Sequence, residues 1–152
     1  MRRSLVAVYV HLVWATWDRL PLLDETIERA VYRAIEAKAA ELGSEVLAIG
    51  VVKDHVRLLT RLPATITIAD LVQKVKGASA HLITHELRPG EFFQWQGTYA
   101  AFCVSHRQLT AAKDYIARQR EHHANSNAAV QWETAVFQQL YSPADTTATI
   151  SQ

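Results

Sequence analysis

The order of strand-like and helix-like segments restricts the fold of this chain more than any other feature. The chain begins with a run rich in valine and aromatic residues, MRRSLVAVYVHLVWATW, which is typical of a long β-strand. An amphipathic helix is predicted next, in DRLPLLDETIERAVYRAIEAKAAELG, because Asp24 is a suitable N-cap, apolar residues follow at helical spacing and Gly43 can end it. Two β-rich runs then meet near Lys53 and Asp54 and stop at Pro63, which indicates a hairpin.

The second half of the chain continues the alternation of helix and strand. A second helix is predicted in TITIADLVQKVKGASAHLITHELRPG, where Thr67 and Asp70 have the spacing of a capping box. Four apolar residues share one face of this helix: Leu71, Val72, Val75 and Leu82. The segment FFQWQGTYAAFCVS predicts a fourth strand with a loop before it, and Ser105 with Gln108 opens a third helix that continues through HRQLTAAKDYIARQREHH.

The resulting order, β-α-β-β-α-β-α, is that of a ferredoxin-like split βαβ unit with an extra C-terminal helix. We therefore expect an α+β fold with an antiparallel sheet and helices covering one face. The other face would then be free for a ligand or a second subunit. Such a fold does not by itself indicate any chemistry.

Composition limits the size and the setting of the protein. The 152 residues suffice for a single domain with a real core, which we place in residues 1–125, with a partly flexible C-terminal extension in 126–152. A formal charge of +1 means that a nucleic acid would have to be attracted by a local basic patch. The single cysteine, Cys103, excludes an internal disulfide and a zinc site built of cysteines, as expected for a cytoplasmic protein. Tyr9 and His11 interrupt the first apolar run, so we expect neither a secretory signal nor a membrane span.

Two pairs of residues carry candidate chemistry. His55 and Arg57 are two residues apart on a predicted strand, so their side chains point to the same face of the sheet. Tyr115 and Gln119 are four residues apart on the predicted third helix and share one of its faces. Each of the four also has an ordinary structural interpretation: Arg57, for example, is expected to face solvent or to pair with an acid such as Asp54.

Five short segments together resemble the single-tyrosine HUH transposases of small bacterial insertion sequences, including the REP-associated tyrosine transposases. The segments are HLVWATWDRLPLL, DHVRLL, KGASAHL, FQWQGTYAAFCVS and YIARQ. They follow the family's order across roughly residues 5 to 125, and in that order they are fairly specific.

The resemblance implies a site and a reaction. In that family two histidines on one strand and a glutamine on the last helix hold Mg²⁺ or Mn²⁺, and a tyrosine one helical turn before the glutamine attacks DNA. His55, Gln119 and Tyr115 match these positions, whereas Arg57 stands where the second histidine is expected. The family also implies single-stranded DNA or DNA hairpin ends as the substrate, a phosphotyrosine intermediate that is rejoined without ATP, and a homodimer whose tyrosine acts on its own or on its neighbour's site.

Arg57 makes the metal site degenerate. A guanidinium stays protonated and has no free lone pair, so it cannot ligate a metal, and it would repel a cation bound beside His55 by about 1–4 kcal/mol. Three interpretations remain open. Arg57 takes over the electrostatic task of the ion by binding the scissile phosphate; the site is rebuilt with His122 or His123, which follow Gln119; or the protein is a catalytically impaired or domesticated relative that binds single-stranded nucleic acid without cutting it.

Basic residues are concentrated in the second half of the chain, where acids are few. If the resemblance holds, they supply a track for the DNA backbone, with a marked dependence of binding on salt. The alternative is that they belong to ordinary solvated helix faces. The predicted DNA contacts are Arg61, Lys74, Lys76, Lys113, Arg118 and Arg120.

Overall fold

The computed structural model describes residues 3–118 and confirms the predicted order of strands and helices. The strands are β1 (Val8–Ala15), β2 (Glu45–Val52), β3 (His55–Leu62) and β4 (Ala100–Val104), and the helices are α1 (Glu25–Glu41), α2 (Ile68–Leu82) and α3 (Leu109–Ala117). Short 3₁₀ turns lie at Trp17–Arg19 and His106–Gln108, and a π-helical turn, Ile83–Leu87, follows α2. The predicted extension 126–152 and the candidates Gln119, Arg120, His122 and His123 lie outside the described residues.

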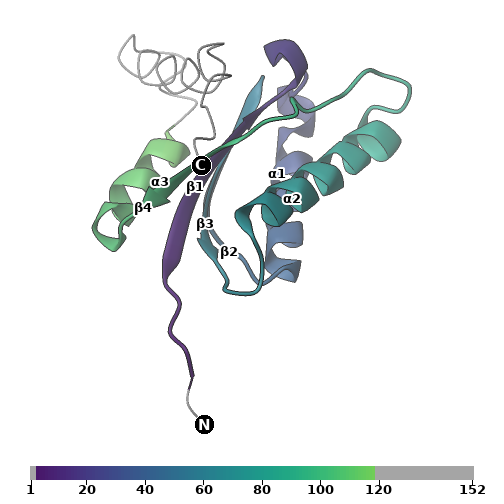
Figure 1. Ribbon diagram of the computed structural model, residues 1–152. Helices are drawn as coiled ribbons and strands as arrows, with labels where there is room; N and C mark the ends of the chain where they lie inside the picture. The colour runs from purple at the N-terminus through teal and green to yellow at the C-terminus, as the bar shows by residue number, and fades with distance from the viewer. Residues whose placement is uncertain (1–2, 119–152) are drawn as a thin grey trace, which may run out of the picture. The chain divides into compact units, whose positions relative to one another are not determined.

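The four strands form one sheet in the order β2-β3-β1-β4, and every neighbouring pair is antiparallel (Figure 1). In the register between β1 and β3, Val13 lies opposite Arg57 and Ala15 lies opposite His55. Strands β1 and β2 run in the same direction with β3 between them, which is the split βαβ arrangement expected from the sequence.

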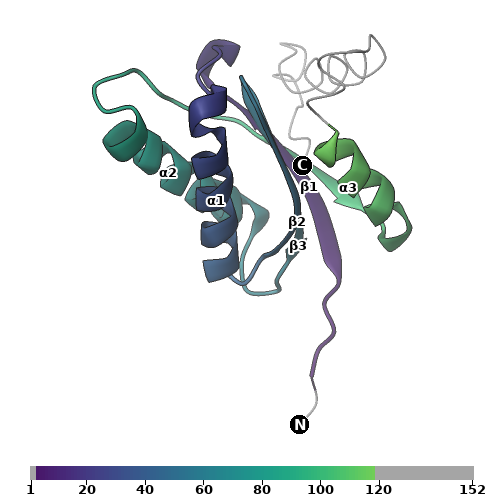
Figure 2. The same ribbon diagram turned by 180° about the vertical axis from the view of Figure 1, so that it is seen from behind.

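Helices α1 and α2 cover one face of the sheet, and α3 lies on the other face (Figures 1 and 2). The core between the sheet and the first two helices includes Leu12, Trp14, Val56 and Leu58 from alternate positions of β1 and β3. Helix α3 contacts β2 and β3, and its Ile116 is buried. The face expected to be free is therefore partly covered by the third helix, which brings its own residues close to β3.

Local sequence signals start and stop these elements as predicted. Asp24 accepts a hydrogen bond from the backbone N–H of Thr26 at the start of α1, and Gly43 after the helix has a φ of 79°, a conformation that glycine adopts without strain. Thr67 accepts a hydrogen bond from the backbone N–H of Asp70 at the start of α2. The two β-rich runs form the expected hairpin between β2 and β3.

The aromatic segment before β4 does more than the sequence indicated. Only Ala100–Val104 joins the sheet as a strand, while Trp95 forms an isolated bridge with Thr16 and is buried. The indole Nε1–H of Trp95 donates hydrogen bonds to Ser79 Oγ and to the Lys76 carbonyl, both at 3.1 Å. As a result Ser79 is fully buried on α2, whereas Leu82, predicted for the apolar face, is only half-buried.

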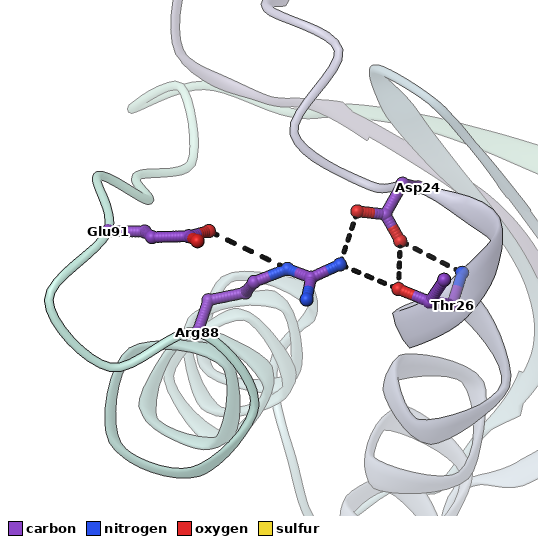
Figure 3. Close-up of polar contacts among 4 residues, drawn as sticks. All are labelled: Asp24, Thr26, Arg88 and Glu91. Carbon is purple, nitrogen blue, oxygen red and sulfur yellow. Dashed lines mark hydrogen bonds and ion pairs between the residues drawn. The ribbon is translucent and has the colours of Figure 1, made fainter.

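The start of α1 is tied to the segment after α2 by a group of polar contacts (Figure 3). The guanidinium of Arg88 donates hydrogen bonds to the Asp24 carboxylate and to Thr26 Oγ1, and also forms an ion pair with Glu91 at 3.6 Å. The hydrogen bond from the Thr26 hydroxyl and then that from Arg88 lower the pKa of Asp24 to about 2 from its ordinary 3.8. Asp24 therefore stays ionised in the folded protein at pH values where an unfolded chain binds a proton.

Replacing Asp24 by asparagine is expected to reduce the fall in the free energy of unfolding between pH 5 and pH 2.5. Because the folded pKa lies below the unfolded one, the contribution of Asp24 is fully present above pH 3.8 and is lost as the pH falls toward about 2. Asparagine still caps the helix but does not titrate. Urea unfolding of both proteins at pH 5 and pH 2.5 measures the difference; equal losses between the two pH values would contradict this role for Asp24.

None of the helices within residues 3–118 is long and apolar enough to cross a membrane.

Candidate active site

Strand β3 places His55 and Arg57 on the face of the sheet that α3 covers. They alternate along the strand with Val56 and Leu58, which belong to the core under α1 and α2. Both side chains are fully buried, with an exposed fraction of 0%. Of the two ordinary structural interpretations of Arg57, exposure to solvent is therefore excluded.

Helix α3 brings Tyr115 to Arg57. The predicted capping box of Ser105 and Gln108 opens the 3₁₀ turn that leads into the helix, and Ile116 is buried against the sheet. The Cζ atom of Arg57 lies 5.4 Å from the centre of the Tyr115 ring, which is the geometry of a cation–π contact. Tyr115 is only half-buried, so its phenol is not sealed inside the core. Arg57 and Tyr115, both candidate site residues from the sequence, are therefore in contact in the folded protein.

Asp54 holds His55 from the turn between β2 and β3. Its carboxylate Oδ1 lies 2.7 Å from Nδ1 of His55, and its Oδ2 lies 3.1 Å from the guanidinium of Arg19. These contacts join Asp54, the acid that the sequence offered as a partner of Arg57, to His55 and Arg19. The contribution of Arg19 could not be foreseen, because it depends on how the segment after β1 packs against the β2–β3 turn.

His11 is a further buried histidine on the same face of the sheet. It lies opposite Leu59 in the register of β1 and β3, two residues along the strand from Arg57, and it is 6% exposed. Its Nε2 has no hydrogen-bond partner within residues 3–118. Burial, and then the positive charge of Arg57, lower the pKa of His11 to about 4 from 6.5. Its proximity to the candidate site could not be foreseen from the sequence, because it depends on the register of β1 against β3.

The imidazole of His11 is expected to remain neutral down to about pH 4. Because its folded pKa is lowered, the stability that depends on neutral His11 is fully present above pH 6.5 and is lost as the pH falls toward about 4. A proton NMR titration measures the midpoint, and the signal that is missing in His11→Gln identifies the residue. A midpoint near 6.5 in the folded protein would contradict the burial of this group beside Arg57.

The described residues do not by themselves fit a divalent ion. No group of three histidine, cysteine, aspartate or glutamate side chains within residues 3–118 has the geometry to hold a metal. Arg57, next to His55 on the strand, adds a positive charge and no lone pair. The two remaining candidates from the sequence, Gln119 and His122, lie outside the described residues.

Two of the predicted DNA contacts are engaged with the protein's own backbone. The guanidinium of Arg61 donates hydrogen bonds to the Val6 carbonyl, with its Nε at 3.0 Å. The ammonium of Lys76 donates to the carbonyls of Gln96 at 2.6 Å and Thr98 at 3.4 Å, and burial lowers the pKa of this lysine. Contact of either residue with DNA would require these hydrogen bonds to be given up.

The other predicted DNA contacts lie on two sides of the sheet. Lys74 is exposed on α2, whereas Lys113 and Arg118 are exposed on and just after α3. Arg120 lies outside the described residues. Within the described part of the chain these residues therefore do not form a single track, and Lys113 and Arg118 are the two closest in sequence to Tyr115.

The fold and the site define an α+β protein of the split βαβ class in which a helix holds a tyrosine over a cationic strand. Within that class the chain belongs to the family described as IS200-like transposases, whose model matches residues 4–119. This match confirms the resemblance seen in the sequence.

Individual relatives agree with the family. The ISDra2 transposase TnpA of Deinococcus radiodurans is 28% identical over 118 residues, which cover 73% of this chain and 83% of the relative. A structure from Deinococcus radiodurans R1, assigned as a transposase, matches with a TM-score of 0.62 at 27% identity and covers 78% of this chain and 95% of its own. A REP-associated tyrosine transposase bound to a REP hairpin matches with a TM-score of 0.60, covering 100% of this chain and 92% of that one. At 18% identity, this last likeness shows the fold alone.

Proposed function

We propose that this transposase-family protein is a DNA strand transferase that cuts and rejoins single-stranded DNA at hairpin ends through a covalent bond to Tyr115. The observation that carries the proposal is the position of the Tyr115 ring against the Arg57 guanidinium, 5.4 Å from its centre. This contact supports the proposal, because attack on a phosphodiester requires a nucleophile close to a positive charge.

The chemistry follows from these two groups. A phenol with an ordinary pKa of about 10 is a poor nucleophile at neutral pH, so it needs a partner that aligns and polarises the phosphodiester. Attack of the phenolic oxygen on phosphorus forms a phosphotyrosine ester and breaks the bond to one nucleotide oxygen. The phenol loses its proton to solvent, and the departing oxygen takes one from solvent. The reverse reaction restores the DNA without ATP, because the ester bond is retained in the intermediate.

Arg57 is proposed to serve in place of the family's metal ion. Its guanidinium can grip two phosphate oxygens at once and offset the charge that develops during attack. Since the described residues do not fit an ion, no step here depends on one. Arg57 is fully buried and contacts the Tyr115 ring, so a phosphate can reach it only when the side chains that cover it shift. DNA binding is therefore proposed to be coupled to movement of the third helix.

A homodimer is part of the same proposal. Strand β4 forms one edge of the sheet and exposes Phe102 and Cys103, while Leu5 and Val8 near the start of β1 are also exposed. An edge strand that presents apolar side chains is suited to pairing with a second copy. Whether Tyr115 acts within its own subunit or on its neighbour depends on that assembly.

A second candidate is a relative that binds hairpin DNA but no longer cuts it. The observation in its favour is that Arg57, where the family resemblance implies a metal-binding histidine, is fully buried. Such a protein keeps the fold and an affinity for DNA that depends on salt.

Incubation of the native protein with end-labelled hairpin oligonucleotides separates the two candidates. We expect a covalent protein–DNA adduct that survives denaturing electrophoresis and forms in EDTA as well as in Mg²⁺ or Mn²⁺. Binding without an adduct under all three conditions would favour the second candidate. Failure to bind single-stranded DNA even at low salt would contradict both.

A further inference from the structure

We infer that Asp54, held in place by Arg19, is a positioning residue that fixes the tautomer and orientation of His55. The consequence for catalysis rests on the proposed function, whereas the effect on the imidazole does not. Three residues carry the inference: Arg19 after β1, Asp54 in the β2–β3 turn and His55 at the start of β3. They form a continuous chain of charged contacts.

The contact between Asp54 and His55 determines which ring nitrogen carries the proton. An ionised carboxylate can only accept hydrogen bonds, so the 2.7 Å contact from Oδ1 requires the proton to be on Nδ1 of the imidazole. In the neutral ring the lone pair is then on Nε2. Carboxylates that hold a histidine in this way fix both the tautomer and the rotation of the ring at functional sites.

Arg19 in turn holds the other oxygen of the Asp54 carboxylate, at 3.1 Å. With both oxygens engaged, the carboxylate has little freedom to rotate away from the imidazole. The ion pair is partly exposed, with 44% of the Arg19 side chain and 24% of the Asp54 side chain accessible. Its effect is therefore expected on the position of Asp54 more than on global stability.

The backbone that delivers Arg19 is strained. Asp18 and Arg19 have φ values of 50° and 53°, in the left-handed region that is unfavourable for residues other than glycine. Such strain persists where surrounding contacts impose it, and it is concentrated at functional sites. Here the Thr16 N–H donates to the Asp54 carbonyl at 2.8 Å and the Thr16 hydroxyl donates to the Leu20 carbonyl at 2.7 Å.

These hydrogen bonds join the strained segment directly to the turn that carries Asp54. The backbone N–H of Asp18 also donates to Gln96 Oε1 at 3.3 Å, which links the segment to the loop before β4. These hydrogen bonds thus offset the energetic cost of the two left-handed residues. They also hold the Arg19 guanidinium against the Asp54 carboxylate. We conclude that the segment after β1 acts on the site through His55.

The position of His55 explains why its orientation matters. His55 and Arg57 lie on the same face of β3, and Tyr115 lies over Arg57. The imidazole of His55 is therefore near the proposed nucleophile. If Asp54 is removed, the carboxylate no longer favours the proton on Nδ1 of His55. DNA capture by surface residues should then persist while strand cleavage is slowed.

The test compares Asp54→Ala and Arg19→Met with Glu41→Gln, which removes a carboxylate charge from the exposed Lys38–Glu41 pair on α1. Long-range ¹H–¹⁵N spectra of the histidine rings, recorded at pH 8, report the tautomer without need of DNA or activity. We expect Nδ1-protonated His55 in the native protein and in Glu41→Gln, a shift toward the Nε2-protonated form in Asp54→Ala, and a smaller shift in Arg19→Met. An unchanged His55 signal in both site variants would overturn the inference.

Cleavage kinetics then test the catalytic consequence. Asp54→Ala is expected to lower the rate of adduct formation, with the Kd for hairpin DNA changed less than about twofold. Equal rates in Asp54→Ala and the native protein would overturn the positioning role in catalysis. If the native protein forms no adduct but the tautomer still depends on Asp54, the proposed function fails while the structural inference stands.

Discussion

Replacement of Tyr115 by phenylalanine is expected to abolish the covalent protein–DNA adduct. Phenylalanine lacks the oxygen that would form the phosphotyrosine bond, and loss of a nucleophile lowers the rate by at least about a thousandfold. The aromatic ring that lies over Arg57 is retained, so the cation–π contact and the packing of α3 should persist. The measurement is denaturing electrophoresis of labelled oligonucleotide after incubation with each protein.

Tyr32→Phe is the matched control for this experiment. Tyr32 is an exposed tyrosine on α1, the helix that packs on the opposite face of the sheet from α3. It should form the adduct at the native rate, and both variants should bind hairpin DNA with native affinity. An adduct formed by Tyr115→Phe would exclude Tyr115 as the nucleophile, even if the protein is a strand transferase.

Replacement of Arg57 by methionine is expected to lower strand cleavage by about a hundredfold or more while the fold is kept. Removal of a preorganised charge donor from a transition state typically costs about 10²–10³ in rate. Urea unfolding of Arg57→Met checks that the fold is kept, because removing one partner of a buried charged contact leaves the other uncompensated. The cleavage rate of Arg57→Lys should lie between those of the native protein and Arg57→Met, because lysine keeps the charge but not the planar pair of donors.

The same variant has a physical effect that does not depend on DNA. Since the charge of Arg57 contributes to the lowered pKa of His11, Arg57→Met should raise the His11 midpoint above about 4, although burial will hold it below 6.5. Single-turnover cleavage and the NMR titration measure the two effects separately. A raised His11 midpoint with an unchanged cleavage rate would show that Arg57 is close to the site but has no catalytic role.

Arg57→His addresses the alternative that the protein is an impaired relative. This variant restores two histidines on one strand, the pattern implied by the family resemblance. If the native protein makes no adduct and Arg57→His makes one in Mn²⁺, then Arg57 is a lesion in a metal site and not a substitute for the ion. If the native protein is active in EDTA and the variant is weaker, Arg57 performs the task itself.

The sequence was most informative where short-range patterns decide the structure. The caps at Asp24 and Thr67 and the box of Ser105 and Gln108 involve residues two or three positions apart, so their geometry is set by the local backbone. The alternation of apolar side chains along β3 likewise put His55 and Arg57 on one face. Family motifs added the assignment of Tyr115, which periodicity alone would have left as an ordinary helix tyrosine.

Other features were decided by packing and could not be read from the chain. Lys76 and Arg61 resemble DNA-binding residues in the sequence, yet both donate hydrogen bonds to distant backbone carbonyls. Arg19 gave no signal, because its contact with Asp54 depends on a left-handed backbone and on the neighbouring turn. His11 is no more than a polar interruption of an apolar run in the sequence, because its low pKa arises from burial and from a charge on the adjacent strand.

By itself, the sequence determined the order of elements, the split βαβ topology and the identity of the chemical groups, because these depend on periodicity, capping and residue type. Only the tertiary structure decided that Tyr115 lies over Arg57, that Arg57 is buried and that Arg19 reaches His55 through Asp54. Those contacts join residues far apart in the chain. They are fixed by sheet register and by which face each helix covers, quantities that depend on the packing of the whole domain.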